Sequence, residues 1–195
     1  MFTGIIETIG RVSAIQTQGT NKTLWIESAI SSELTIDQSV AHNGVCLTVE
    51  EISQNAHRIT AVAETLKKTN LNHWENDTII NLERCLPMNG RLDGHIVQGH
   101  VDAIATCLRI DEKEGSWEYL FRFDAAFATL VIEKGSISLN GISLTLFNVA
   151  NDTFQVAIIP YTYEHTNLKQ LTAGGIVNIE FDMIGKYVNR FLQFK

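Results

Sequence analysis

The feature of this sequence that most constrains its fold is an internal repeat. Residues 43–48 read Asn-Gly-Val-Cys-Leu-Thr, and residues 140–145 read Asn-Gly-Ile-Ser-Leu-Thr, 97 residues later. Two further matches keep the same offset: residues 69–71 with 166–168, and residues 80–83 with 177–180. Three collinear matches in one register indicate a duplication. We therefore expect two halves of about 90 residues each, with one shared fold.

Short segments rich in β-branched and aromatic residues predict that both halves are built from strands. The clearest segments are residues 24–27, 45–49, 58–62, 78–83, 118–123, 153–159 and 176–181. Gly, Asn and Asp separate them at hairpin-like spacings, and no long amphipathic helix lies between them. Because closure removes exposed sheet edges, we predict a small closed antiparallel barrel in each half, with a sandwich as the alternative.

A turn-rich stretch at residues 87–94 has the composition of a domain boundary, so we place the first domain at residues 1–94 and the second at 95–183. Residues 183–194 carry apolar side chains at helical spacing. A single helix this short is marginal in water. We therefore expect the C-terminal helix, residues 184–195, to pack on its own barrel or on another subunit.

Composition excludes several classes of protein. The formal net charge is −7 and no Lys/Arg cluster forms a stripe, which argues against nucleic-acid binding. Cys46, Cys85 and Cys107 include no Cys-x-x-Cys pair, so we expect neither a disulfide framework nor a zinc site, and a reducing cytoplasm fits. No secretion signal or membrane-spanning apolar run is recognisable.

The repeated motif places chemically useful side chains at equivalent positions. Cys46 and Ser143 each stand two residues before a threonine, Thr48 or Thr145. Alternate residues of a strand face the same side, so each half presents a pair of thiol or hydroxyl groups that suits a polar ligand. Two plainer interpretations stay open: Asn-Gly alone suits a tight hairpin turn, and Cys46 can be a small buried apolar residue.

Two histidines lie among glycines in residues 94–102. His95, His100 and Asp102 match no zinc spacing, so no metal site is predicted. His100 is a candidate acid or base because imidazole titrates near neutrality, although a lone histidine is often structural. Phosphate-loop, dinucleotide-binding and nucleophile-elbow motifs are absent from the sequence, which disfavours nucleotide hydrolysis and α/β-hydrolase chemistry.

Taken together, these motifs resemble the riboflavin synthase family over almost the whole chain. The segments that carry the resemblance are residues 1–5, 41–48, 64–66, 69–71, 94–102, 134–135, 140–145 and 182–187. They are separate motifs in the right order at compatible distances, which makes the resemblance more specific than any one of them. It implies an all-β fold of two homologous six-stranded antiparallel Greek-key barrels in tandem, followed by a C-terminal α-helix used in a homotrimer.

The resemblance also implies an activity. Each barrel would bind one 6,7-dimethyl-8-ribityllumazine, and a four-carbon unit would pass between the two molecules to give riboflavin and 5-amino-6-(D-ribitylamino)uracil, with no cofactor. The active site is expected where the first barrel of one subunit faces the second barrel of a neighbour, and association with lumazine synthase is conceivable. The alternatives are a non-catalytic lumazine-binding antenna protein of the same superfamily and, less well supported by the charge, an oligonucleotide-binding barrel.

Site residues follow from the resemblance position by position. The first site would use Gly4, Ile5, Ile6, Cys46, Leu47, Thr48, Glu64 and Thr65. The second would use Gly99, His100, Val101, Lys134, Ser143, Leu144, Thr145, Pro160, Tyr161 and Thr162, with Asp182 as a further polar candidate. The candidates for proton transfer and nucleophilic addition are Cys46, His100, Ser143 and Thr145.

Two departures from the family pattern stand out. Asn140 replaces an Asp that many relatives have, which puts a carboxylate role there in doubt, and Tyr161 stands where the first half has Glu64. We therefore expect the two ribityl contacts to differ.

Overall fold

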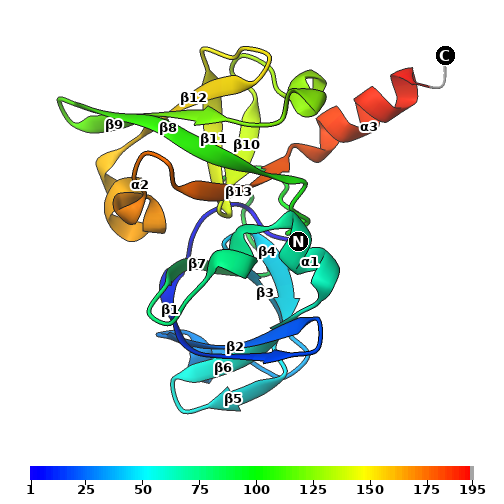
Figure 1. Ribbon diagram of the computed structural model, residues 1–195, viewed down its shortest axis with the longest axis vertical. Coiled ribbons are helices and arrows are strands. Elements are labelled where there is room, and N and C mark those ends of the chain that lie inside the picture. The colour runs from blue at the N-terminus through cyan, green and yellow to red at the C-terminus, as the bar shows by residue number, and fades with distance from the viewer. Residues whose placement is uncertain (194–195) are drawn as a thin grey trace.

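The computed structural model describes residues 1–193 and contains two β-rich halves (Figure 1). The described part of the first half has the strands β1 Thr8–Gln18, β2 Asn21–Ser28, β3 Ser39–His42, β4 Val45–Thr48, β5 Glu51–Ser53, β6 Ala56–Ala61 and β7 Ile79–Arg84. That of the second half has β8 Ala103–Lys113, β9 Ser116–Arg122, β10 Ser136–Leu139, β11 Ile142–Phe147, β12 Thr153–Ile158 and β13 Ile176–Phe181. All seven segments predicted as strands fall on strands of the structure, with small shifts at their ends.

The second half forms the closed antiparallel barrel that the sequence predicts. Its strand order is β10-β11-β12-β9-β8-β13, and β13 pairs back with β10 to close the ring. One side of each strand faces the interior, which is filled by aromatic side chains. The largest fully buried ones are Tyr119, Phe121, Phe154 and Phe181.

The first half corrects the prediction of a closed six-stranded barrel. It forms a seven-stranded sheet in the order β4-β3-β7-β1-β2-β6-β5, whose two end strands do not pair with each other. Val49 and Glu50 separate β4 from β5. The Val49 N–H donates to Gln38, on the β3 side, whereas the Glu50 N–H donates to Arg58 of β6. In the second half the equivalent Leu146 N–H also donates to Gly135, but β11 continues to Phe147 and pairs there with β12, which keeps the ring closed.

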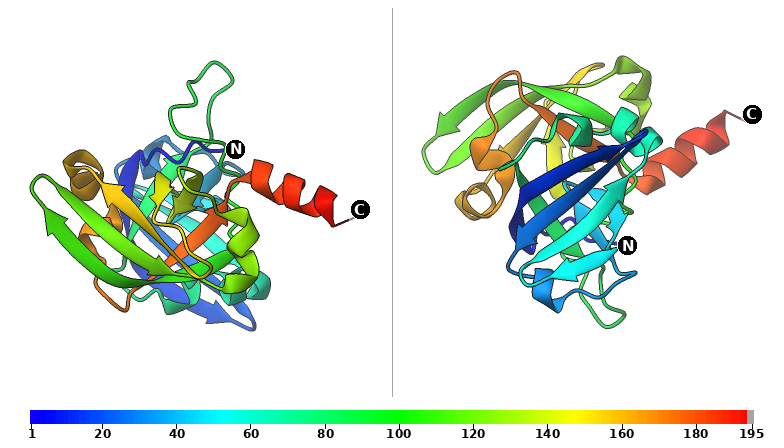
Figure 2. Two further views of the ribbon diagram at one scale, coloured as in Figure 1. Left: turned by 90° about the horizontal axis from the view of Figure 1, so that it is seen from above. Right: turned by 60° about the horizontal axis from the view of Figure 1, so that its bottom comes forward.

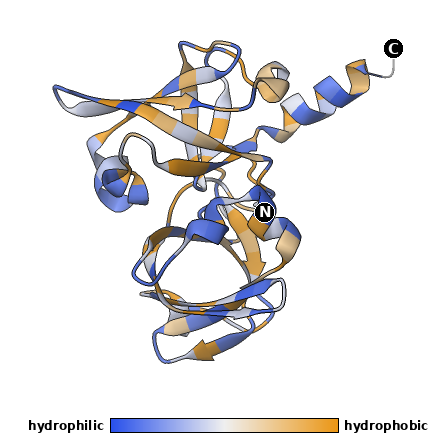
Figure 3. Cartoon of the chain, viewed as in Figure 1, coloured by the Kyte–Doolittle hydropathy of each residue, from blue (hydrophilic) through white to orange (hydrophobic). Residues whose placement is uncertain are grey.

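The core of the first half is mainly aliphatic, with Leu24, Ile26, Ile59, Ile80 and Leu82 among its fully buried residues. Figure 3 shows hydrophobic and hydrophilic residues alternating along many strands of both halves. This alternation is what a sheet with one buried face requires, and burial of apolar surface is the main force that stabilises it.

The two Asn-Gly dipeptides form the tight hairpin turns that the sequence predicts. Asn43 and Gly44 connect β3 to β4, and their φ angles are 47° and 77°. Asn140 and Gly141 connect β10 to β11 with φ angles of 46° and 83°. Positive φ at both central residues is characteristic of the turn type that matches strand twist.

Helices occupy the same positions in both halves. Two six-residue helices, α1 Ala63–Lys68 and α2 Pro160–His165, follow β6 and β12, and the sequence analysis did not predict them. The 3₁₀ segments are Ser31–Glu33, Asn70–His73, Ala125–Leu130 and Asn167–Gln170.

The predicted terminal helix is α3, Met183–Leu192, which projects away from the second half (Figure 1). Asp182 caps it by accepting a hydrogen bond from the Ile184 N–H. Phe194 of the predicted helix lies outside the described residues. Among the described residues, no helix has the length and apolar character needed to cross a membrane.

Residues 85–94 form the connection between the halves. Figure 2 shows this loop standing away from both of them. The start of this loop is held to the N-terminus of the chain, since the Leu86 N–H donates to the Met1 carbonyl.

Candidate functional site

The two halves meet around the Asn-Gly turns. A Cβ atom added to Gly44 would lie 2.7 Å from the Gly141 nitrogen, and one added to Gly141 would lie 2.8 Å from the Gly44 nitrogen. The Asn81 amide donates to the Asn140 carbonyl at 3.0 Å, and the Asn178 amide donates to the Asn43 carbonyl at 2.9 Å. These reciprocal contacts relate the halves by an approximate two-fold axis that passes between the turns.

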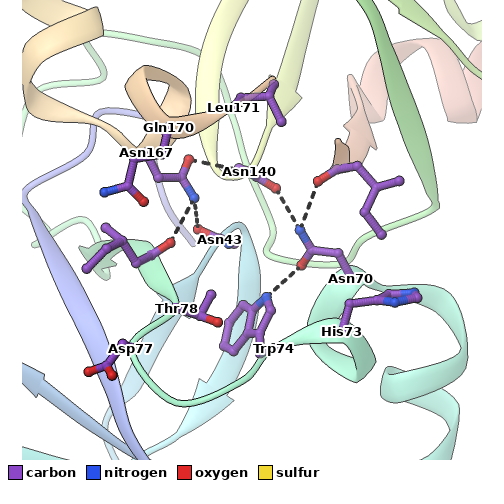
Figure 4. A pocket seen from close by; sticks show the side chains of 12 residues that line it. Asn43, Asn70, His73, Trp74, Asp77, Thr78, Asn140, Asn167, Gln170 and Leu171 are labelled. Carbon is purple, nitrogen blue, oxygen red and sulfur yellow. Dashed lines mark hydrogen bonds between the residues drawn. The ribbon is translucent and has the colours of Figure 1, made fainter. Parts of the chain in front are cut away.

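A cavity of about 280 Å³ lies beside this axis, and Figure 4 shows asparagines from both halves pointing into it. The Asn43 side-chain oxygen accepts from the Asn81 N–H and from the Asn167 amide. The Asn70 amide in turn donates to Asn140. Because these polar groups already bind one another, we interpret the cavity as part of the joint between the halves rather than as a ligand site. The Asn-Gly residues of the motif are therefore structural.

Alternate residues after each Asn-Gly turn share one face of the strand, as the sequence predicts. In β4, Leu47 is buried, Cys46 is half-buried and Thr48 is exposed. In β11, Ser143 is half-buried and Thr145 is exposed. We call β4 the first edge and β11 the second edge. Each edge presents a thiol or hydroxyl beside a threonine, as strand periodicity requires.

Each edge is contacted by a segment from the opposite half, whereas the resemblance groups residues 4–6 with Cys46 and residues 99–101 with Ser143. We call residues 1–6 the first arm and residues 96–101 the second arm. The Ser143 N–H donates to the Gly4 carbonyl at 2.8 Å, and the Cys46 N–H donates to the Gly99 carbonyl at 2.9 Å. The first arm therefore lies on the second edge, and the second arm lies on the first edge.

Side-chain packing supports this crossing. Ile6 of the first arm packs against the core of the second half, and Val101 of the second arm packs against the core of the first half. The arms also pair with each other through an antiparallel bridge between Phe2 and Val97. The repeat alone could not show which half each arm covers. The two arms occupy equivalent positions in the repeat, so their sequences fit either the same half or the opposite one.

The first edge is thus surrounded by Gly99, His100 and Val101. Glu64 and Thr65 lie in the first turn of α1, whose Leu66 packs against the same core as Val101. Glu64 is exposed and forms an ion pair with Lys68 at 3.4 Å. Burial raises the pKa of the Cys46 thiol, so this group stays protonated near neutral pH.

The second edge is contacted by Gly4 of the first arm and by His95, a histidine that the site prediction left out. His95 Nδ1 and Ser143 Oγ share a hydrogen bond of 2.6 Å. His95 is buried, and burial lowers the pKa of its ring, while the charge of Asp182 acts in the opposite direction. The sequence gives no motif that links His95 to Ser143, because 48 positions separate the two residues.

The remaining predicted residues lie farther along the second half. Pro160, Tyr161 and Thr162 begin α2, which is held to the barrel by Tyr163 stacked on Trp117, with ring centroids 3.7 Å apart. The Lys134 amine lies 6.0 Å from the ring centroid of Phe147, at the far end of β11. Leu144 packs partly against the core of the second half.

A second cavity lies along the outer side of the first arm. It measures about 640 Å³, a volume suited to a small-molecule ligand, and Ile5, Ile6 and Arg84 are among its lining residues. Ser143 is not among them. Within the described residues, no group of three or more His, Cys, Asp or Glu side chains is arranged to hold a metal ion.

Comparisons with known proteins agree with the duplicated architecture. A family model described as the lumazine binding domain matches twice, at residues 3–85 and 98–182. A riboflavin synthase of Bacillus subtilis (strain 168) is 41% identical over 193 residues, covering 98% of this chain and 90% of that protein. A riboflavin synthase of Brucella abortus (strain 2308) is 35% identical over 201 residues and covers 100% of both.

Solved structures show the same fold. The crystal structure of LumP complexed with riboflavin has a TM-score of 0.87 at 23% identity, covering 93% of this chain and 99% of that chain. LumP complexed with 6,7-dimethyl-8-(1'-D-ribityl) lumazine gives a TM-score of 0.85 at 21% identity, with the same coverage. Identities this low support the fold alone.

Proposed function

This chain belongs to the riboflavin synthase family, and we propose that each of its two crossed edges holds one 6,7-dimethyl-8-ribityllumazine. The family reaction is a dismutation in which one lumazine gives a four-carbon unit to the other. Its products are riboflavin and 5-amino-6-(D-ribitylamino)uracil. The low identity to the LumP structures, against 41% to a riboflavin synthase, favours the enzyme over the antenna protein.

The observation that carries the proposal is the presence of two equivalent edges with different chemical groups. Donor and acceptor are the same compound, so a duplicated fold supplies two similar sites. Cys46 lies on the first edge, and Ser143, hydrogen-bonded to His95, lies on the second. The corresponding helices begin with Glu64 in one half and Tyr161 in the other. These differences can give identical substrates unequal roles.

The chemistry requires removal of a proton from the C7 methyl group of one lumazine and addition of a nucleophile at C7 of the other. Cys46, His100, Ser143 and Thr145 are our candidates for these steps. The hydrogen bond between His95 and Ser143 would hold the Ser143 hydroxyl in one orientation. Alignment of two lumazines in reacting register can itself supply several kcal/mol of the rate acceleration.

We further propose that residues 1–94 and 95–183 act as two Greek-key lumazine-binding domains and that α3 joins three chains. Apolar side chains of α3 are exposed in the single chain, including Tyr187 and Phe191, each 70% exposed. The reacting pair of sites would then come from the first half of one subunit and the second half of its neighbour. The three free cysteines fit a cytoplasmic protein, and lumazine synthase is a candidate partner.

The test is to incubate the purified protein with 6,7-dimethyl-8-ribityllumazine and to follow riboflavin absorbance without added cofactor. We expect riboflavin to form, and Cys46→Ala, His100→Ala and Ser143→Ala to lower turnover while circular dichroism stays that of a folded β protein. Lumazine binding without riboflavin formation would identify an antenna protein instead. Wild-type turnover in all three variants would refute the proposed set of residues.

A further inference from the structure

Two buried glutamates hold the arms. Glu83 on β7 and Glu180 on β13 are 97 residues apart in the repeat and are 5% and 2% exposed. Glu83 accepts from the Thr3 N–H at 2.6 Å, from the Thr3 hydroxyl at 2.7 Å and from the Gly4 N–H at 3.1 Å. Without Glu83, these three donors of the first arm would be buried with no hydrogen-bond acceptor.

Glu180 repeats the arrangement in the second arm. It accepts from the Gln98 N–H at 2.6 Å and from the Gly99 and His100 N–H groups at 2.8 Å each. Two of these contacts involve residues assigned to the site. Because His100 is bonded through its backbone, Glu180 fixes where this residue sits without touching its side chain.

Each arm packs closely against the edge of the opposite half. Gly4 and Gly99 have φ angles of 78° and 82°, which favour glycine. An added Cβ atom would lie 2.6 Å from the Ser143 Cβ in one case and 2.5 Å from the Cys46 Cβ in the other. A small shift of either arm therefore changes the surroundings of Ser143 or Cys46 directly.

A carboxylate is well suited to this task. It has two acceptor oxygens and no hydrogens when ionised, so it can take N–H groups from successive residues and impose one turn on them. A Gln side chain keeps the size but replaces one oxygen with an NH₂ group, which would face backbone donors. A buried carboxylate without such partners would be costly, so the N–H groups and the glutamate depend on each other.

We infer that Glu83 and Glu180 are positioning residues that act across the two halves: Glu180 of the second half shapes the first edge through Gly99 and His100, and Glu83 of the first half shapes the second edge through Gly4. Each glutamate thus belongs functionally to the site of the other half. The inference rests on the proposed function for its effect on turnover, whereas the direction of the crossing can be tested without substrate.

The experiment uses the full chain labelled with ¹⁵N and carrying Glu180→Gln or Glu83→Gln, with the exposed hairpin residue changed in Glu114→Gln as the matched control. The Cys46 and Ser143 amides report on the two edges, because each donates to one arm. Loss of the hydrogen bonds that join an arm to its charged glutamate should loosen that arm, and exchange of the edge amide that donates to the arm should then accelerate by about tenfold or more. We expect Glu180→Gln to affect Cys46 and not Ser143, and Glu83→Gln to do the reverse.

Turnover supplies the second readout. We expect the loss of turnover caused by Glu180→Gln to be non-additive with that of Cys46→Ala and additive with that of Ser143→Ala. For Glu83→Gln we expect additivity with Cys46→Ala and non-additivity with Ser143→Ala. If either Gln variant does not fold, the Asp variant at that position, which keeps the charge but shortens the reach, takes its place. Faster exchange at both amides, or at the amide of the same half, would overturn the crossing. A crossed exchange pattern with unchanged turnover would overturn the positioning role, whereas an inactive wild type with a crossed pattern would count against the proposed function alone.

Discussion

A pair of buried histidines should make the stability of the first half depend on pH. His42 Nε2 and His57 Nε2 are 2.8 Å apart, and both residues are fully buried. The His42 Nδ1–H donates to the Val40 carbonyl, so His57 must donate between the rings, and the Ser31 hydroxyl then donates to His57 Nδ1. Both rings are neutral in this chain of hydrogen bonds. Protonation of His42 at Nε2 would set two N–H groups against each other.

The sign of the effect follows from the pKa shifts. Burial lowers the pKa of His57 from 6.5 to about 4, and burial together with the neighbouring His57 lowers the pKa of His42 well below its ordinary value. The unfolded chain takes up these protons near pH 6.5, whereas the folded chain resists them. The stability is therefore fully present above about pH 6.5 and is lost as the pH falls toward 4.

For His57 alone, the shift predicts a loss of about 2 kcal/mol in the free energy of unfolding between about pH 7.5 and pH 5. His42 acts in the same direction. In a chain of this size, about 2 kcal/mol corresponds to a lowering of the melting temperature by roughly 4–8 °C. Burial raises the pKa of Glu83 and Glu180, which acts in the opposite direction, so the wild-type curve alone does not isolate the histidines.

The second half of the chain provides the matched variant. At the positions 97 residues after Ser31, His42 and His57 it has Ala128, Leu139 and Phe154, so the triple change to Ala, Leu and Phe replaces the polar chain by side chains that the same fold already accommodates. Urea unfolding of both proteins across this pH range gives the difference directly. We expect the variant to lose about 2 kcal/mol less than the wild type on acidification. Parallel pH curves for the two proteins would refute the reasoning.

Two further predictions concern the joint and the terminal helix. Gly44→Ala should destabilise the chain by at least about 2 kcal/mol in urea unfolding, because the residue needs positive φ and its Cβ would strike Gly141. The control is Gly19→Ala, which has a similar φ but open space around it and therefore reports the backbone strain alone. Equal losses in both variants would show that the contact between the turns is unimportant. Deletion of residues 184–195 should convert the proposed trimer to monomers in sedimentation, and an unchanged mass would contradict the role given to α3.

The strands could be predicted from the sequence because their signal is local. Alternation, β-branched residues and Asn-Gly turns act within a few positions, and the repeat allows each half to support the other. The six-residue helices α1 and α2 escaped because one and a half turns are too short for helical periodicity. Pro160, which follows the strand predicted at residues 153–159, occupies the first turn of α2, where a missing N–H costs nothing.

Only those features of the site that follow from alternation along a single strand could be predicted from the sequence. The outward pairing of Cys46 with Thr48, and of Ser143 with Thr145, follows from alternation along one strand. The crossing of the arms does not, because it depends on which half's core accepts Ile6 or Val101. A signal for the holding glutamates was present in the repeat: Glu83 and Glu180 are the last residues of the matched segments 80–83 and 177–180, whose residues are all buried.

The approximate two-fold axis makes the differences between the two edges more informative than their similarities. A symmetric pair of sites would treat two identical lumazines alike, yet the reaction needs one donor and one acceptor. The arms, the turns and the holding glutamates preserve the symmetry, whereas the two edges differ in the groups that they present, Cys46 at the first and Ser143 with His95 at the second. A thiol with a raised pKa stays protonated at the first edge, whereas at the second edge burial keeps His95 neutral and able to accept the Ser143 proton. Oxygen nucleophile chemistry is therefore better supported at the second edge than thiolate chemistry at the first.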